Sequence, residues 1–101
     1  MSTLIARGDP TNALRVALSK RLATKAAQPR YEAFLERAPS RIAEHARSLS
    51  GAALPEGIAL WEQARALSES AVRHSLDAQS VVFELAGLLA ALAPTSSAAK
   101  G

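Results

Sequence analysis

The apolar residues of this chain recur every three or four positions over most of its length, which places them on one face of an α-helix. Leu14, Leu18 and Leu22 show this spacing within residues 10–27. Residues 55–75 are apolar on two sides, and a helix of that kind is usually buried between neighbours or shared between subunits. The pattern therefore predicts an all-α fold.

The chain opens with a short apolar segment, residues 3–7, that ends at a glycine. Gly8 stands where a helix C-cap would stand, and Asp9 and Pro10 suit the N-cap and the first turn of a new helix that runs to residue 27. Because a helix as short as the first segment is marginal by itself, we expect the chain to be a fragment of a longer protein.

Prolines divide the rest of the chain. Pro39 is expected to separate a helix at residues 30–37 from another at residues 40–49. The last helix is expected to begin after Asp77, a candidate N-cap, and to end before Pro94. Between them lies the long helix that is apolar on two sides.

Five helices joined by short turns predict one bundle-like domain over residues 1–93, followed by a disordered C-terminal tail at residues 94–101. The composition agrees, because alanine, the best helix former, supplies 23 of the 101 residues. The sequence has no cysteine, and no apolar stretch is long enough to cross a bilayer, so the expected location is the cytoplasm.

The two long C-terminal helices carry more apolar faces than five short helices can bury internally, which favours association with another chain. The candidate core or interface residues are the large apolar ones on these faces. They are Trp61, Leu67, Val82, Phe83 and Leu89.

Positive charge is concentrated in the first half of the chain. Residues 1–50 hold nine Lys and Arg against four acids, a net charge of +5, whereas residues 51–101 hold three against five, a net charge of −2. A candidate basic patch on the first long helix consists of Arg15, Lys20, Arg21 and Lys25. A solvated helix face is one interpretation of this charge, and a nucleic-acid surface is the alternative.

Residues typical of catalysis are few. The five glycines match neither the phosphate-binding loop nor the dinucleotide fingerprint of nucleotide-binding proteins. His45 and His74 are the only imidazoles, and both are expected to have surface or capping roles. We therefore predict that the chain is not an enzyme by itself and holds no cofactor, metal or small molecule.

Two stretches resemble a known family. The first is RYEAFLERAPSRIAEHAR, at residues 30–47, and the second is LWEQARALSESAVRHSLDAQSVVFELAGLLAAL, at residues 60–92. In the second stretch a Trp-Glu pair opens a long helix, and Ser75 precedes the Leu-Asp pair that caps the last one. The arrangement resembles the C-terminal domain of the delta-prime subunits of bacterial DNA polymerase III, in their alphaproteobacterial form. In that family an asparagine usually stands where Ser75 is found here.

The resemblance implies a role in assembly rather than in catalysis. Delta-prime subunits are similar to AAA+ ATPases, and their helical C-terminal domains pack with those of the tau/gamma and delta subunits into a collar of the clamp loader. The collar holds the loader together while the AAA+ modules place the sliding clamp on primed DNA. The family's zinc module and arginine finger lie in the AAA+ part, and no residue of this chain matches them. Direct contact of the basic half with nucleic acid stays open.

Overall fold

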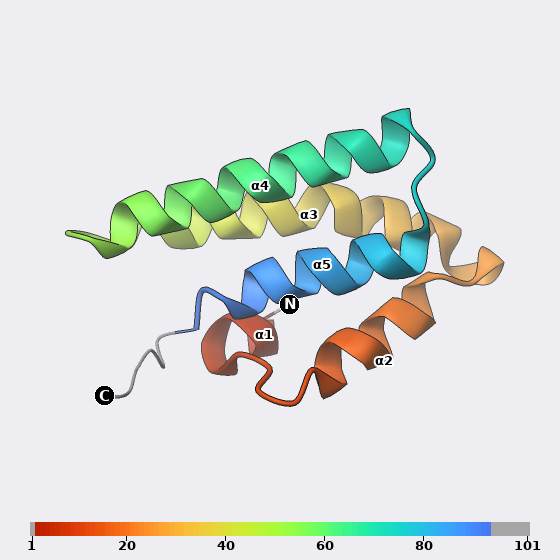
Figure 1. The fold of residues 1–101 in the computed structure, drawn as a ribbon, viewed down its shortest axis with the longest axis horizontal. Helices are drawn as coiled ribbons and strands as arrows, with labels where there is room; N and C mark the ends of the chain where they lie inside the picture. The colour runs from red at the N-terminus through yellow and green to blue at the C-terminus, as the bar shows by residue number, and fades with distance from the viewer. Residues whose placement is uncertain (1, 94–101) are drawn as a thin grey trace.

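A computed structural model of the chain describes residues 2–93, and within these residues the regular elements are all helices (Figure 1). Its elements are α1 (Ser2–Arg7), α2 (Ala13–Leu22), the 3-10 turn η1 (Lys25–Ala27), α3 (Gln28–Ala46), α4 (Ala53–Arg73) and α5 (Ala78–Ala90). The prediction of an all-α, five-helix domain is confirmed. The predicted tail at residues 94–101 lies outside the described residues.

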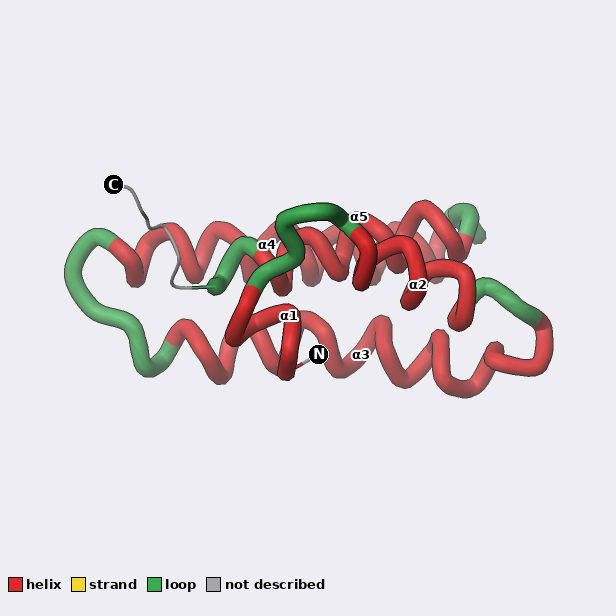
Figure 2. The backbone as a smooth tube through the Cα atoms, turned by 90° about the horizontal axis from the view of Figure 1, so that it is seen from below, coloured by secondary structure: helices red, strands yellow, loops and turns green. Residues whose placement is uncertain are grey.

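Helix α5 is the centre of the fold and packs against each of the other four α-helices. Figure 2 shows α2, α5 and α4 together in one layer, with α1 and α3 along its other side. Val82, Leu85 and Leu89 of α5 are 0% exposed, so this helix supplies the middle of the hydrophobic core. Helix α4 runs antiparallel to α3, and the two form a long hairpin (Figure 1).

The first helix is integrated into this core although it is short. Leu4 and Ile5 of α1 are buried, and α1 packs against α5. Gly8 adopts a φ of +73°, and its N–H donates to the carbonyl of Leu4 at 2.9 Å, which confirms the predicted C-cap.

The second helix begins later than the sequence predicts. It starts at Ala13 rather than Pro10 and ends at Leu22, and the turn η1 follows. Asp9 nevertheless caps it, because its carboxylate accepts hydrogen bonds from the backbone N–H of Leu14 at 3.1 Å and of Arg15 at 2.8 Å. The reach is five and six residues, longer than that of an ordinary N-cap, so the boundary estimated from Asp9 and Pro10 was wrong.

Pro39 does not divide the next segment, and this prediction was also wrong. Residues 30–37 and 40–49 were predicted as two helices, but α3 is continuous through Pro39. Because proline has no N–H, the carbonyl of Leu35 loses its helical hydrogen bond, and an interior proline costs about 3 kcal/mol. A continuous helix aligns six residues on one buried side, which offsets that cost. They are Tyr31, Phe34, Leu35, Ala38, Ile42 and Ala46.

The last two helices agree closely with the sequence. Helix α4 lies two residues before the predicted span at each end, and α5 begins directly after Asp77. The Asp77 carboxylate accepts hydrogen bonds from the backbone N–H and the hydroxyl of Ser80, both at 2.9 Å. The predicted N-cap is therefore confirmed, and these hydrogen bonds lower the pKa of Asp77.

Candidate functional site

The residues that helix α4 buries fully are small, whereas two of its large apolar residues are exposed. The residues that it buries are Gly57, Ala64, Ser68 and Ala71. Ile58 is 42% exposed and Val72 is 72% exposed, and Trp61 is only partly buried. Since a large exposed apolar side chain is more informative than a buried one, the outward side of α4 is the main candidate for a functional surface.

Small residues on α4 allow α3 to approach closely. A Cβ atom added at Gly57 would lie 2.8 Å from Cδ1 of Leu49 and 3.2 Å from Cβ of Ala46, which is closer than van der Waals contact. The hairpin is therefore tight along its buried side. On the outward side the two helices diverge into a groove, which we call the α3–α4 groove.

One end of the α3–α4 groove is built around Trp61. Ile58 and Leu54 of α4 lie beside it, with Ala43 and Ala46 across the groove on α3, and they enclose about 270 Å³. The guanidinium carbon of Arg65 lies 5.2 Å from the centroid of the Trp61 ring, within the range of a cation–π contact. This end of the groove offers an apolar pocket bordered by positive charge.

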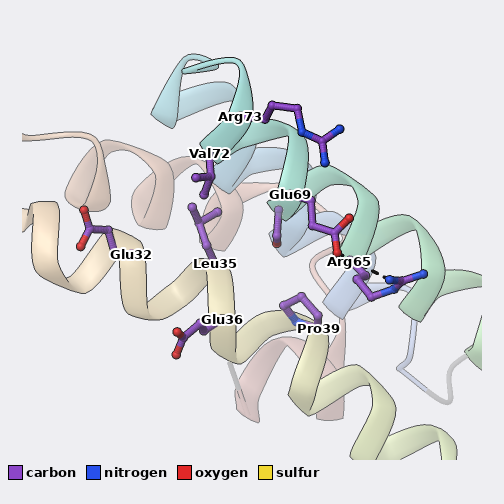
Figure 3. Close-up of a pocket in the computed structure, with 9 residues that line it drawn as sticks. Glu32, Leu35, Glu36, Pro39, Arg65, Glu69, Val72 and Arg73 are labelled. Atoms are coloured by element: carbon purple, nitrogen blue, oxygen red, sulfur yellow. Dashed lines mark ion pairs between the residues drawn. The ribbon is translucent and has the colours of Figure 1, made fainter.

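The other end of the α3–α4 groove is larger and is shown in Figure 3. Its volume is about 650 Å³, and its apolar wall is formed by Leu35 and Pro39 of α3 and by Val72 of α4. Charged side chains surround that wall. They are Glu32 and Glu36 on α3, and Arg65, Glu69 and Arg73 on α4.

The two walls of this larger end differ in charge. The α3 wall contributes the carboxylates of Glu32 and Glu36, whereas both arginines stand on α4. Arg65 is paired with Glu69 at 3.5 Å, an exposed ion pair that contributes at most about 1 kcal/mol to stability. A partner that lies in the groove therefore meets an acidic edge on one side and a largely basic edge on the other.

The two ends form one continuous stripe on α4. Ile58, Trp61, Arg65, Glu69 and Val72 follow each other at intervals of three or four residues, the period that keeps side chains on one helix face. The sequence predicts this alignment for the apolar members of the stripe. It does not predict that the stripe faces outward, because more than one side of this helix carries both small and large residues.

The predicted core or interface residues separate into two groups. Val82 and Leu89 are 0% exposed and belong to the core. Trp61 and Leu67 are partly buried and pack against the core, and Phe83 is partly buried beneath the guanidinium of Arg15. Leu67 lies on a different side of α4 from the α3–α4 groove, in a small hollow with Gly87 and Leu88 of α5.

The predicted basic patch is not brought together as one surface. Arg15 turns toward α5, where its Nε donates to the carbonyl of Phe83 at 3.0 Å and its guanidinium covers the Phe83 ring. Lys20 and Arg21 are exposed, but they project from α2 in directions about 100° apart, and Lys25 lies beyond the helix on η1. One of the four residues on which the nucleic-acid alternative rests, Arg15, is therefore engaged in an internal contact.

The residues that could act in catalysis or bind a metal do not cluster in the part of the chain that the structure describes. His45 is partly buried near the end of α3, and His74 is exposed at the end of α4. Within residues 2–93 no group of three or more His, Asp or Glu side chains could hold a metal ion. Across the same described residues, no helix has both the length and the apolar character needed to cross a membrane.

The comparisons with known proteins give no relative for this chain. No family model, no curated protein and no solved structure matches it.

Proposed function

We propose that this chain is a protein-binding module that receives a helical segment of a partner in the α3–α4 groove. The proposal rests on the burial pattern of α4. The residues that this helix buries fully are small, and the large side chains of Ile58 and Val72 are exposed. Burying the exposed part of such a side chain contributes on the order of 1 kcal/mol each. Ile58 lies beside Trp61 at one end of the groove and Val72 lines the other end, so a helix lying along the groove would cover all three side chains.

The more specific proposal is that the module belongs to the collar of a bacterial clamp loader. The stretches that resemble delta-prime subunits, residues 30–47 and 60–92, cover most of α3, α4 and α5. These helices supply both walls of the α3–α4 groove and the core beneath it. In this role the chain contributes to assembly, and its partners are the C-terminal domains of the tau/gamma and delta subunits.

The test mixes the full chain with purified C-terminal domains of alphaproteobacterial tau/gamma and delta subunits. Size-exclusion chromatography with light scattering then measures the mass of any complex. We expect a stable complex with the wild-type chain. Replacing both Ile58 and Val72 by glutamate places charge in the groove and should abolish the complex.

The matched control is Leu76→Glu, since Leu76 is 40% exposed, close to the 42% of Ile58, and does not line the groove. This variant should bind like the wild type. A wild-type chain that forms no complex with either subunit would refute the collar role. Binding to duplex DNA that falls with salt and disappears on replacing Lys20 and Arg21 by alanine would favour the nucleic-acid alternative instead.

A further inference from the structure

Helix α3 has a second groove on its other flank, toward α2. Arg30, Ala33, Phe34 and Arg37 line this side at intervals of three, one and three residues, the spacing of a single helical face. Leu18 and Leu22 of α2 form the opposite wall, and the groove encloses about 270 Å³. We call it the α2–α3 groove.

The groove exists because α2 is held by α5 and has few contacts with α3. Arg15 attaches α2 to α5 through the carbonyl and ring of Phe83. The turn η1, whose N–H of Ala27 donates to the hydroxyl of Thr24 at 3.2 Å, then redirects the chain into α3. As a result α2 and α3 are joined at one end, and Leu18 faces α3 across open space.

The charge of the α2–α3 groove is entirely positive. Its six lining residues include two arginines and no acid. Neither Arg30 nor Arg37 takes part in an ion pair with another described residue. The nearest acids along α3, Glu32 and Glu36, line the α3–α4 groove on the opposite flank.

Two further cations lie near this groove, Arg21 on α2 and Lys25 on η1. Arg21 and Lys25 each follow a groove leucine by three residues, and both are exposed. The groove thus has an apolar floor between separated cations. Arg30 and Arg37 stand two helical turns apart, about 10 Å along the axis.

We propose that the α2–α3 groove binds an acidic amphipathic helix of a protein partner. Apolar side chains of that helix would pack on Leu18 and Ala33, above the buried Leu22 and Phe34, and carboxylates two turns apart would pair with Arg30 and Arg37. Arginine suits this role because its planar fork can hold a carboxylate through two hydrogen bonds.

A protein ligand fits this surface better than a nucleic acid does. Phe34 is buried, so its ring offers no platform on which a base could stack. Of the other lining residues, only Arg30 and Arg37 could contact a base or a phosphate, and Leu18, Leu22 and Ala33 between them favour an apolar side chain. This inference does not depend on membership of a clamp loader, because it concerns a different groove and a different charge.

The experiment measures fluorescence anisotropy of a labelled synthetic peptide of about four helical turns, with leucines on one face and glutamates beside them. A matched peptide carries lysine in place of each glutamate. The full chain should bind the acidic peptide at least about tenfold more tightly than the basic one, and this preference should shrink as salt is raised.

Three variants test the location. Replacing both Arg30 and Arg37 by glutamate should weaken the acidic peptide by at least about tenfold. Ala33→Gln keeps the charge and fills the exposed centre of the groove with a good helix former, so it should weaken binding without loss of folding. Lys20→Glu makes the same type of charge change on the opposite side of α2 and should leave the affinity unchanged.

Circular dichroism confirms that each variant is folded. Equal affinity for the two peptides would overturn the proposal, as would acidic-peptide binding that survives both groove variants. Binding of duplex DNA without binding of the acidic peptide would overturn it as well. The variant with glutamate at both Ile58 and Val72 should still bind the peptide, which separates this groove from the α3–α4 groove.

Discussion

The guanidinium of Arg15 covers the ring of Phe83, with its central carbon 3.8 Å from the ring centroid, although the two residues are 68 positions apart in the sequence. The same side chain donates from Nε to the Phe83 carbonyl at 3.0 Å and from a terminal nitrogen to Oδ1 of Asn12 at 3.0 Å. One arginine therefore joins α2 to the central helix of the core through a cation–π contact and a hydrogen bond.

Arg15→Ala is expected to lower the free energy of unfolding by about 1–2 kcal/mol, because it removes the cation–π contact and a partly buried hydrogen bond. Arg15→Lys should recover only part of this loss, since an ammonium lacks the planar fork. Urea unfolding followed by circular dichroism measures both. Lys20→Ala, which replaces an exposed cation on the same helix, serves as the control and should change stability by less than about 0.5 kcal/mol.

Gly87 leaves the space that Arg15 occupies. A Cβ atom at this position would lie 2.7 Å from the guanidinium carbon of Arg15, so Gly87→Ala must displace that side chain. Alanine in the middle of a helix is otherwise better than glycine by about 1 kcal/mol. We expect Gly87→Ala to raise the free energy of unfolding of the Arg15→Ala variant by about 1 kcal/mol. In the wild-type chain the same substitution should raise it much less. A double-mutant cycle in urea measures the difference, and equal effects in both backgrounds would contradict the contact.

Gly57 presents the opposite case, because one of its two neighbours, Ala46, has no side chain that can rotate away. The added Cβ would approach Ala46, whose position is fixed by the α3 backbone, at 3.2 Å, and Leu49 at 2.8 Å. Crowding of this kind costs typically about 1–3 kcal/mol and exceeds the gain in helix propensity. Gly57→Ala should therefore lower the free energy of unfolding by about 1 kcal/mol. Ala59→Gly, at an exposed position of the same helix, controls for propensity alone. A stabilised Gly57→Ala variant would show that the hairpin is less tight than described.

The helices themselves could be predicted from the sequence because their signals are local. The apolar period identified α4 and α5 to within about three residues at each end, and Asp77 and Gly8 marked two helix ends correctly. The failures came where distant contacts outweigh local preference. Pro39 is tolerated within α3 because the buried stripe of that helix is continuous, and the start of α2 depends on a carboxylate that reaches across several residues.

The candidate sites were harder to predict for the same reason. Arg15 was predicted as part of a basic surface, but its role is set by Phe83, far along the chain. The exposure of Ile58 and Val72 depends on α3 packing against the small residues of α4, which no local pattern reveals. Arg30 and Arg37 were not predicted as functional residues, because only the placement of α2 makes them the edges of a groove.

Tyr31 should make the stability of the protein depend on alkaline pH. Its hydroxyl is buried without a hydrogen-bond partner among the described residues. Burial raises the pKa of Tyr31, and the negative charge of Asp77 raises it further. Because the folded chain holds the proton more tightly than the unfolded chain, stability is fully present below the unfolded pKa of about 10 and declines as pH rises above it.

Tyr31→Phe tests this dependence, because it removes the titrating group and relieves an unpaired buried hydroxyl. It should leave the chain as stable or more stable at pH 7, by up to about 1 kcal/mol, and should flatten the decline above pH 10. Urea unfolding at neutral and alkaline pH measures the two effects. A variant that loses stability at neutral pH would show that the hydroxyl has a favourable partner in solution.

Asp77 should produce the opposite dependence, at acid pH. The N–H of Ser80 and then its hydroxyl favour the carboxylate, and they lower the pKa of Asp77 in the folded chain. Stability from this cap is therefore present above the unfolded pKa of about 4 and is lost as pH falls through the lower folded value. Asp77→Asn keeps an oxygen acceptor for the Ser80 N–H but does not titrate. Thermal unfolding between about pH 6 and pH 2 should show the wild type losing its advantage over Asp77→Asn as the carboxylate is protonated. Asp77→Ala removes the acceptor and should have a lower Tm than the wild type at pH 7. If the difference in Tm between the wild type and Asp77→Asn does not change with pH, the charge of Asp77 does not contribute to the cap.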